Sequence, residues 1–255
     1  MLFPGSDFDL RGILAPDDVD DQSPIRTEYL RIVPHVLDLA RDFGVELSAE
    51  SQLNVSLLMR SMEVIDRYFD DIQDASQATV FLKNVLLVLA SVPGVRTIQS
   101  TNLPQEVLNS LVVLREVLLR QGTLPDFLKT VQEVCLLSRK MRTMKDTRQY
   151  INAALHEGEL AADLLLLSID LDEPSKKFSD YLRFAVGTGT LVDHLFDFED
   201  DYHNHQTVLP PNITNRSFMM ATLVKRAIYL FSLHPNKNRA LGYLSMSGRY
   251  SESSV

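Results

Sequence analysis

The segment Gly189-Thr-Leu-Val-Asp193-His-Leu-Phe-Asp197-Phe-Glu-Asp-Asp201-Tyr202 carries the strongest structural signal in this chain of 255 residues. Its aspartates at 193, 197 and 201 are four residues apart, which in a helix stacks three carboxylates on one face, about one turn apart. Leu195, Phe196 and Phe198 lie between them and Leu191 and Val192 precede them, which predicts a helix with buried flanks. A carboxylate row beside a buried surface suits Mg²⁺, which takes oxygen ligands, keeps several waters and completes its shell with substrate phosphates.

A second acidic segment, Asp66-Arg-Tyr-Phe-Asp70-Asp71-Ile-Gln-Asp74, ends an earlier predicted helix and repeats the four-residue interval. If the two helices face each other, their carboxylate rows can hold two or three Mg²⁺ ions with a diphosphate as the bridging anion. A third acidic run, at residues 17–21, follows Pro16 in polar surroundings. We interpret that run as a solvated tail.

The remaining sequence predicts one helical domain. Its apolar residues recur at helical spacing, and a chain that is 45% apolar with only 10 Gly and 11 Pro can bury one core. We expect residues 1–23 to form a flexible acidic arm and residues 24–255 to form a single all-α bundle. Helices are predicted over residues 25–43, 48–74, 81–92, 104–120, 125–167 with a break near Gly158, 176–202, and 217–233.

Composition excludes several classes of function. The net charge of −9 comes without a basic stripe, which argues against a nucleic-acid partner. No apolar run approaches the roughly 18 residues of a membrane span, and the N-terminus has no signal-peptide pattern, so we expect a cytoplasmic protein. The single cysteine, Cys135, cannot form an internal disulfide and is interpreted as a small core residue. A homodimer is compatible with the sequence.

The two acidic segments resemble the metal-binding motifs of class I terpene synthases, members of the trans-isoprenoid synthase superfamily. The segment DDIQD at 70–74 is similar to the DDxxD motif that these enzymes share with trans-prenyl diphosphate synthases. The segment DHLFDFEDD at 193–201 is similar to their second motif, often NDLFSFxKE, with Leu-Phe and the following Phe in register. All three ligand positions are aspartates here, so they differ in residue type and remain oxygen donors.

This resemblance implies a bundle of the class I isoprenoid (terpene) synthase type over roughly residues 25–250. It implies a Mg²⁺-dependent cyclase, a carbon–oxygen lyase that ionises an allylic prenyl diphosphate of the farnesyl or geranylgeranyl class and releases diphosphate. Arg148, 45 residues before Asp193, would sense the diphosphate, and Arg249 and Tyr250 would close over it. Three Mg²⁺ ions with bound diphosphate would be held by six aspartates: Asp70, Asp71, Asp74, Asp193, Asp197 and Asp201.

Two alternatives stay open. The all-aspartate second motif favours a trans-prenyl transferase that joins prenyl diphosphates, although the N-terminal region has no Gly-Gly-Lys-x-x-Arg segment. The other alternative is a non-catalytic helical adaptor, in which both acidic rows are merely solvated faces. The C-terminal segment Ser247-Gly-Arg-Tyr250 is predicted to be a lid that orders with ligand, against the simpler interpretation of a frayed terminus.

Overall fold

The computed structural model describes residues 28–70, 72, 75–91, 102–169 and 175–240. Within these ranges the chain forms helices and no strand, which confirms the expected all-α class for this part of the chain. No helix in these ranges is long and apolar enough to cross a membrane. The predicted acidic arm at residues 1–23 lies outside the described residues.

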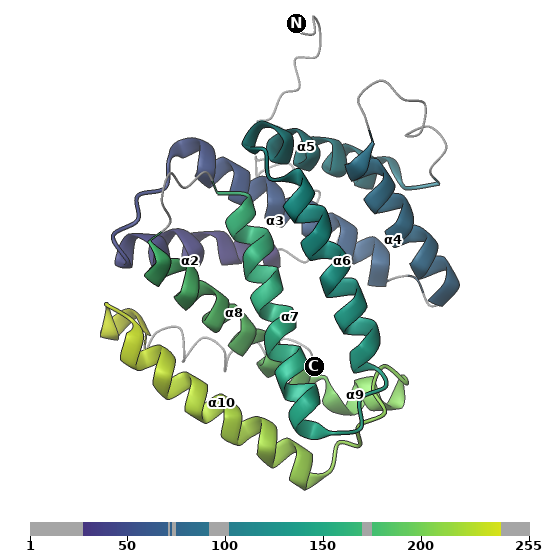
Figure 1. The fold of residues 1–255 in the computed structure, drawn as a ribbon, viewed down its shortest axis with the longest axis vertical. Helices are drawn as coiled ribbons and strands as arrows, with labels where there is room; N and C mark the ends of the chain where they lie inside the picture. Colours follow the sequence, from purple (N-terminus) through teal and green to yellow (C-terminus); the bar gives the residue numbers. More distant parts are fainter. Residues whose placement is uncertain (1–27, 71, 73–74, 92–101, 170–174, 241–255) are drawn as a thin grey trace, which may run out of the picture.

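The most extensive packing is between α7 and α8, with α6 against α7, α10 against α8, and α3 against both α2 and α5 (Figure 1). Because α8 packs against α7 on one side and α10 on another, the helix that carries most of the acidic segment has a rigid support. The bounds are α2 (Glu28–Asp42), α3 (Ala49–Asp70), α4 (Ala75–Ala90), α5 (Gln105–Gln121), α6 (Leu124–Met141), α7 (Thr147–Leu167), α8 (Lys176–Phe196), α9 (Phe198–His203) and α10 (Ile213–Leu233).

Several helices begin and end at the residues that the sequence predicts. Gly122 caps α5 with φ of 72°, and its N–H donates to the carbonyls at the end of that helix. Gly44 takes the same left-handed conformation, also with φ of 72°, just after α2. The hydroxyl of Ser48 accepts a hydrogen bond from the N–H of Ser51 at 3.1 Å, which satisfies a free donor in the first turn of α3.

The helix break predicted near Gly158 is wrong. Helix α7 runs through this residue, and the helical segment is instead interrupted earlier, between α6 and α7. Asp146 caps the start of α7, where its side chain accepts a hydrogen bond from the N–H of Gln149 at 2.8 Å. Gly158 instead allows α7 to approach α8 closely. A Cβ atom at this position would lie 2.5 Å from Oγ1 of Thr190 and 2.6 Å from Cα of Gly187.

The buried apolar side chains of the described residues form two clusters, and the smaller one lies beneath the acidic segment of α8 and α9. Leu195 and Phe198, which lie between the aspartates in sequence, and Leu191, which precedes them, are buried in it. This confirms the predicted burial of the helix flanks, except that Phe196 is 59% exposed. Cys135 on α6 is only half-buried, and burial raises the pKa of its thiol, which suits a packed rather than a reactive cysteine.

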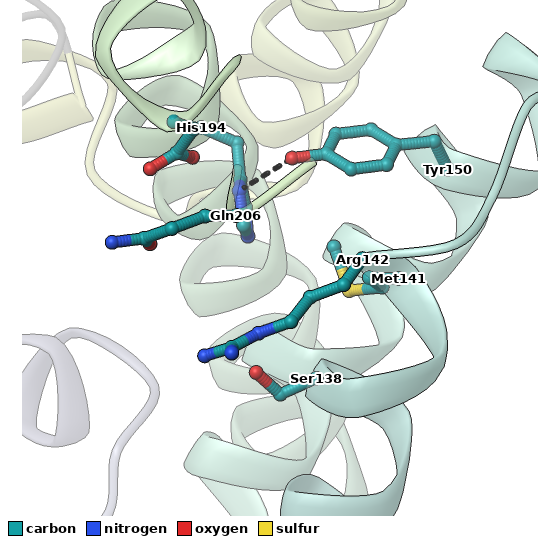
Figure 2. Close-up of a pocket in the computed structure, with 7 residues that line it drawn as sticks. Ser138, Met141, Arg142, Tyr150, His194 and Gln206 are labelled. Atoms are coloured by element: carbon teal, nitrogen blue, oxygen red, sulfur yellow. Dashed lines mark hydrogen bonds between the residues drawn. The ribbon is translucent and has the colours of Figure 1, made fainter. Parts of the chain in front are cut away.

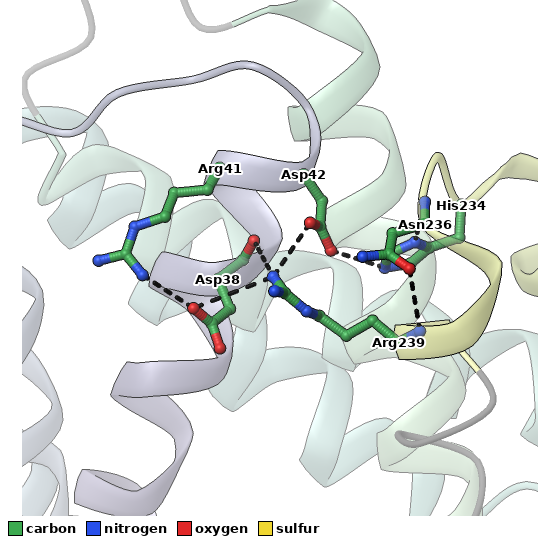
Figure 3. Close-up of polar contacts among 6 residues, drawn as sticks. All are labelled: Asp38, Arg41, Asp42, His234, Asn236 and Arg239. Atoms are coloured by element: carbon green, nitrogen blue, oxygen red, sulfur yellow. Dashed lines mark hydrogen bonds and ion pairs between the residues drawn. The ribbon is translucent and has the colours of Figure 1, made fainter.

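Residues 234–240 are held against α2 by a polar cluster (Figure 3). Nη1 of Arg239 lies 3.0 Å from Oδ1 of Asp42 and donates to the carbonyl of Asp38 at 3.1 Å. His234 is fully buried, with Nε2 3.8 Å from Oδ2 of Asp42, and its Nδ1 accepts from the N–H of Asn236 at 3.0 Å. These contacts join the end of the described chain to its beginning.

This cluster predicts a loss of stability in mild acid. Burial lowers the pKa of His234 from its usual value of about 6.5, with Lys237 and Arg239 adding to the effect and Asp42 opposing it. Between the lowered pKa and about 6.5 the unfolded chain binds this proton and the folded chain does not, so stability falls as pH drops below about 6.5. We expect His234→Asn, whose amide oxygen can still accept from the Asn236 N–H, to lose less stability between about pH 7 and pH 5. Urea unfolding at both pH values measures this, and equal losses in both proteins would contradict it.

Candidate functional site

The acidic row of Asp193, Asp197 and Asp201 crosses the junction between α8 and α9. The N–H of Asp197 donates to the carbonyl of Asp193 at 2.9 Å, and that of Asp201 donates to the carbonyl of Asp197 at 2.8 Å, so the three residues follow one another by one turn. The single helix predicted over residues 176–202 is divided at Asp197, which follows α8 and precedes α9 with φ of −83° and ψ of −1°. Asp193 and Asp197 are exposed, whereas Asp201 is half-buried.

A small pocket of about 60 Å³ lies beside Asp201 (Figure 2). Within it, Nδ1 of His194 lies 3.1 Å from the hydroxyl of Tyr150, and Nε2 of the same ring lies 3.1 Å from Oε2 of Glu157. Tyr150 and Glu157 are two turns apart on α7, so they hold the His194 side chain of α8 between them. The pocket is lined by Ser138, Met141, Arg142, Tyr150, His194, Asp201 and Gln206.

The electrostatics of the pocket keep the Tyr150 hydroxyl protonated. Burial raises the pKa of Tyr150, and the negative charges of Asp201 and Glu157 raise it further. The hydroxyl therefore stays protonated. With Tyr150 at Nδ1 and Glu157 at Nε2, the His194 ring is held from both sides.

The carboxyl group of Asp201 has a raised pKa. Burial raises its pKa, and the neighbouring Asp197 and Asp200 raise it further, whereas His194 and Arg142 oppose this shift. A cation bound at Asp201 would favour its ionised form, so the residue is suited to gain a positive partner.

Two arginines near the row differ in their surroundings. Arg142, at the end of α6, lines the pocket together with Asp201. Arg148, in the first turn of α7, is exposed, and its guanidinium carbon lies 5.9 Å from the centre of the Phe218 ring on α10. The structure thus brings Arg142 to the acidic row and directs Arg148 toward α10.

Most of the other predicted site residues lie outside the described part of the chain. Asp71, Asp74, Arg249 and Tyr250 are outside it, and only the backbone of Asp70, the last residue of α3, is described. Among the residues that are described, no three His, Cys, Asp or Glu side chains form a group that could hold a metal ion. The row itself offers the carboxylate oxygens that Mg²⁺ prefers, so it fits a hard cation in ligand type and needs oxygen ligands from elsewhere to complete the shell.

His194, Tyr150 and Glu157 were not among the predicted site residues. The available sequence signal was the seven-residue interval between Tyr150 and Glu157, which places two polar groups on one face of a largely apolar helix. That signal does not identify His194 as their partner, because the pairing depends on how α7 packs against α8.

A second, more open pocket of about 310 Å³ lies away from the acidic row, with α6, α7 and α8 contributing to its lining. Nε of Arg183 lies 2.6 Å from Oδ1 of Asp163 there, and Nη1 lies 3.5 Å from Oδ1 of Asp180. Because Arg183, the cation in its lining, pairs with Asp163 and Asp180, this pocket offers less for an anionic ligand than the pocket with Arg142 does.

A scan against protein-family models, a search of curated proteins and a search of solved structures found no match to this chain. The functional argument therefore depends on the residues and geometry described above.

Proposed function

We propose that this protein is a Mg²⁺-dependent class I terpene synthase that acts on an allylic prenyl diphosphate of the farnesyl or geranylgeranyl class. The observation that carries the proposal is the one-turn spacing of Asp193, Asp197 and Asp201, with the third carboxylate beside Arg142 in a polar pocket. Carboxylates and a guanidinium at one place suit a ligand that combines divalent cations with a diphosphate.

Each group of residues in the site would have a separate role in binding the metal ions and the diphosphate. Asp193 and Asp197 are exposed and would meet the metal ions as these arrive with the diphosphate, while Asp201 would bind from the half-buried side. When bound, Mg²⁺ neutralises the charge that develops on the leaving diphosphate. Asp70, Asp71 and Asp74 would supply the opposing carboxylates, and Arg249 and Tyr250 would donate to the diphosphate oxygens.

The pocket beside Asp201 limits what can enter it. Its volume of about 60 Å³ is far below the roughly 300–1,000 Å³ of sites that enclose a small organic molecule. In this proposal it holds waters around a metal ion or part of the diphosphate, and the prenyl chain lies elsewhere. Tyr150 and Glu157 fix the His194 ring and so hold the second motif in register with α7.

A trans-prenyl transferase is the second candidate, because all three positions of the second motif are aspartates. The experiment that separates the candidates is an assay of diphosphate release by the purified protein with Mg²⁺ and farnesyl or geranylgeranyl diphosphate. Release without a second substrate supports the synthase, and release that requires isopentenyl diphosphate supports the transferase. Absence of release under both conditions, at Mg²⁺ levels that restore activity to a known synthase, would refute both and favour an adaptor.

The arginine that reads the diphosphate can be identified in the same assay. Because Arg142 lies at the pocket with Asp201 and Arg148 lies against Phe218, we expect Arg142→Lys to lower kcat/KM more than Arg148→Lys does. Lysine keeps the charge but loses the planar two-point grip on phosphate oxygens, for which we expect a loss of about tenfold or more. A larger loss in Arg148→Lys would contradict this and return the role to the arginine that the family resemblance implies.

A further inference from the structure

Helix α10 exposes an unusual amount of apolar surface. Of the fifteen large hydrophobic side chains that are exposed in the described residues, seven belong to this helix. Ile213 is 82% exposed, Ile228 66%, Met220 52% and Val224 51%. In Figure 1, α10 lies at the edge of the molecule, with α8 and α7 on its inner side. A helix that is apolar around most of its circumference is normally buried, so the exposed outer face of α10 indicates an interaction surface.

The inner face of α10 is already satisfied by its own chain. Asn215, Met219 and Leu223 are buried there, and the guanidinium carbon of Arg226 lies 3.6 Å from the centre of the Phe184 ring. The outer face is a separate strip, which we call the α10 seam: Ser217, Ala221, Val224 and Ile228, all of them exposed. Its spacing of four, three and four residues is the spacing with which one helix packs along another.

We propose that the α10 seam is the interface between two copies of this chain, with their α10 helices antiparallel across a twofold axis. The seam is self-complementary in this arrangement. An axis between residues 221 and 224 places residue 221 of one copy opposite residue 224 of the other, and residue 217 opposite residue 228. Each pair joins a small side chain to a large one, Ala with Val and Ser with Ile, so knobs on one helix meet holes on the other.

The charge distribution favours a second copy over a lipid surface. The chain has a net charge of −9, yet α10 contains no Asp or Glu, so two copies that meet along it bring no acidic side chains of this helix together. Helices that bind anionic membranes carry many basic residues on their polar face. Here two of the three cations of α10 pair within the chain, Arg216 with Glu199 at 2.9 Å and Arg226 with Glu159 at 3.9 Å.

The exposed area of this face is more than half of what a stable dimer needs. Val224 and Ile228 of the seam, with Ile213 and Met220 beside it on the same side of the helix, present on the order of 500 Å² of surface per copy, against the 800 Å² or so per partner of a standard interface. Residues beside the seam would add to this area.

The test is the mass of the full chain in solution, measured by light scattering or sedimentation over a range of concentrations. The wild-type protein is expected at twice its 28.9 kDa. Ile228→Glu should raise the dimer dissociation constant by about 100-fold, since it places two buried charges in the interface without partners. The matched control is Leu136→Glu on α6, because Leu136 and Ile228 are both 66% exposed, and this variant should stay dimeric.

A cross-link tests the pairing itself. In a Cys135→Ser background, a mixture of Ala221→Cys chains and Val224→Cys chains should form a disulfide-linked dimer on oxidation, and a Leu136→Cys chain should not. A wild-type chain that is monomeric at every concentration would overturn the proposal. An Ile228→Glu protein that dimerises as tightly as wild type would also overturn it. So would a monomeric wild-type chain that binds phosphatidylserine vesicles through α10. None of these results depends on whether the protein releases diphosphate.

Discussion

Gly158→Ala is expected to lower the free energy of unfolding by about 3 kcal/mol, the upper part of the usual range for overpacking a core. The new Cβ would lie 2.6 Å from Cα of Gly187 and 2.8 Å from the carbonyl oxygen of Val186, and neither backbone atom can move unless α8 moves. The helices that support the acidic row would then have to separate. Urea unfolding measures the change directly.

Gly189→Ala is the matched control. It lies on the exposed side of α8, where an added Cβ would meet nothing within 4 Å. Alanine is the better helix former by about 1 kcal/mol, so this variant should be as stable as wild type or slightly more stable. A Gly158→Ala protein that is as stable as Gly189→Ala would show that α7 and α8 do not cross as closely as described.

The sequence predicted the ends of the helices better than it predicted how the helices pack, and Gly158 shows why. Helix ends are set by local signals, so Ser48 and Gly122 could be recognised without knowing the fold. Gly158 could not, because a glycine within an apolar periodic segment is compatible with a break or with close packing on another helix. Only the opposing Gly187 on α8 distinguishes the two.

In the candidate site, too, the sequence predicted the contacts within one helical segment and missed those between helices. The spacing of Asp193, Asp197 and Asp201 predicted their one-turn stacking, because i to i+4 geometry is local. The chain from Tyr150 through His194 to Glu157 joins residues 44 and 37 positions apart, and it depends on the crossing of α7 and α8. The same dependence explains why Arg142, rather than Arg148, lies beside Asp201. The interval of 45 residues before Asp193 had instead indicated Arg148.

Asp197→Ala is expected to lower the Mg²⁺-dependent rate of diphosphate release by about 100-fold or more, because a metal ion supplies several kcal/mol of charge stabilisation and each 1.4 kcal/mol is tenfold in rate. The fold should survive, since Asp197 is exposed and its backbone hydrogen bond to Asp193 does not involve the side chain. Circular dichroism would therefore be unchanged. Asp180→Ala, which removes the same charge from an exposed site on the same helix, is the control and should keep the wild-type rate. If Asp197→Ala also keeps that rate, the row is only a solvated face of α8 and α9, and the metal-dependent function proposed for it is wrong.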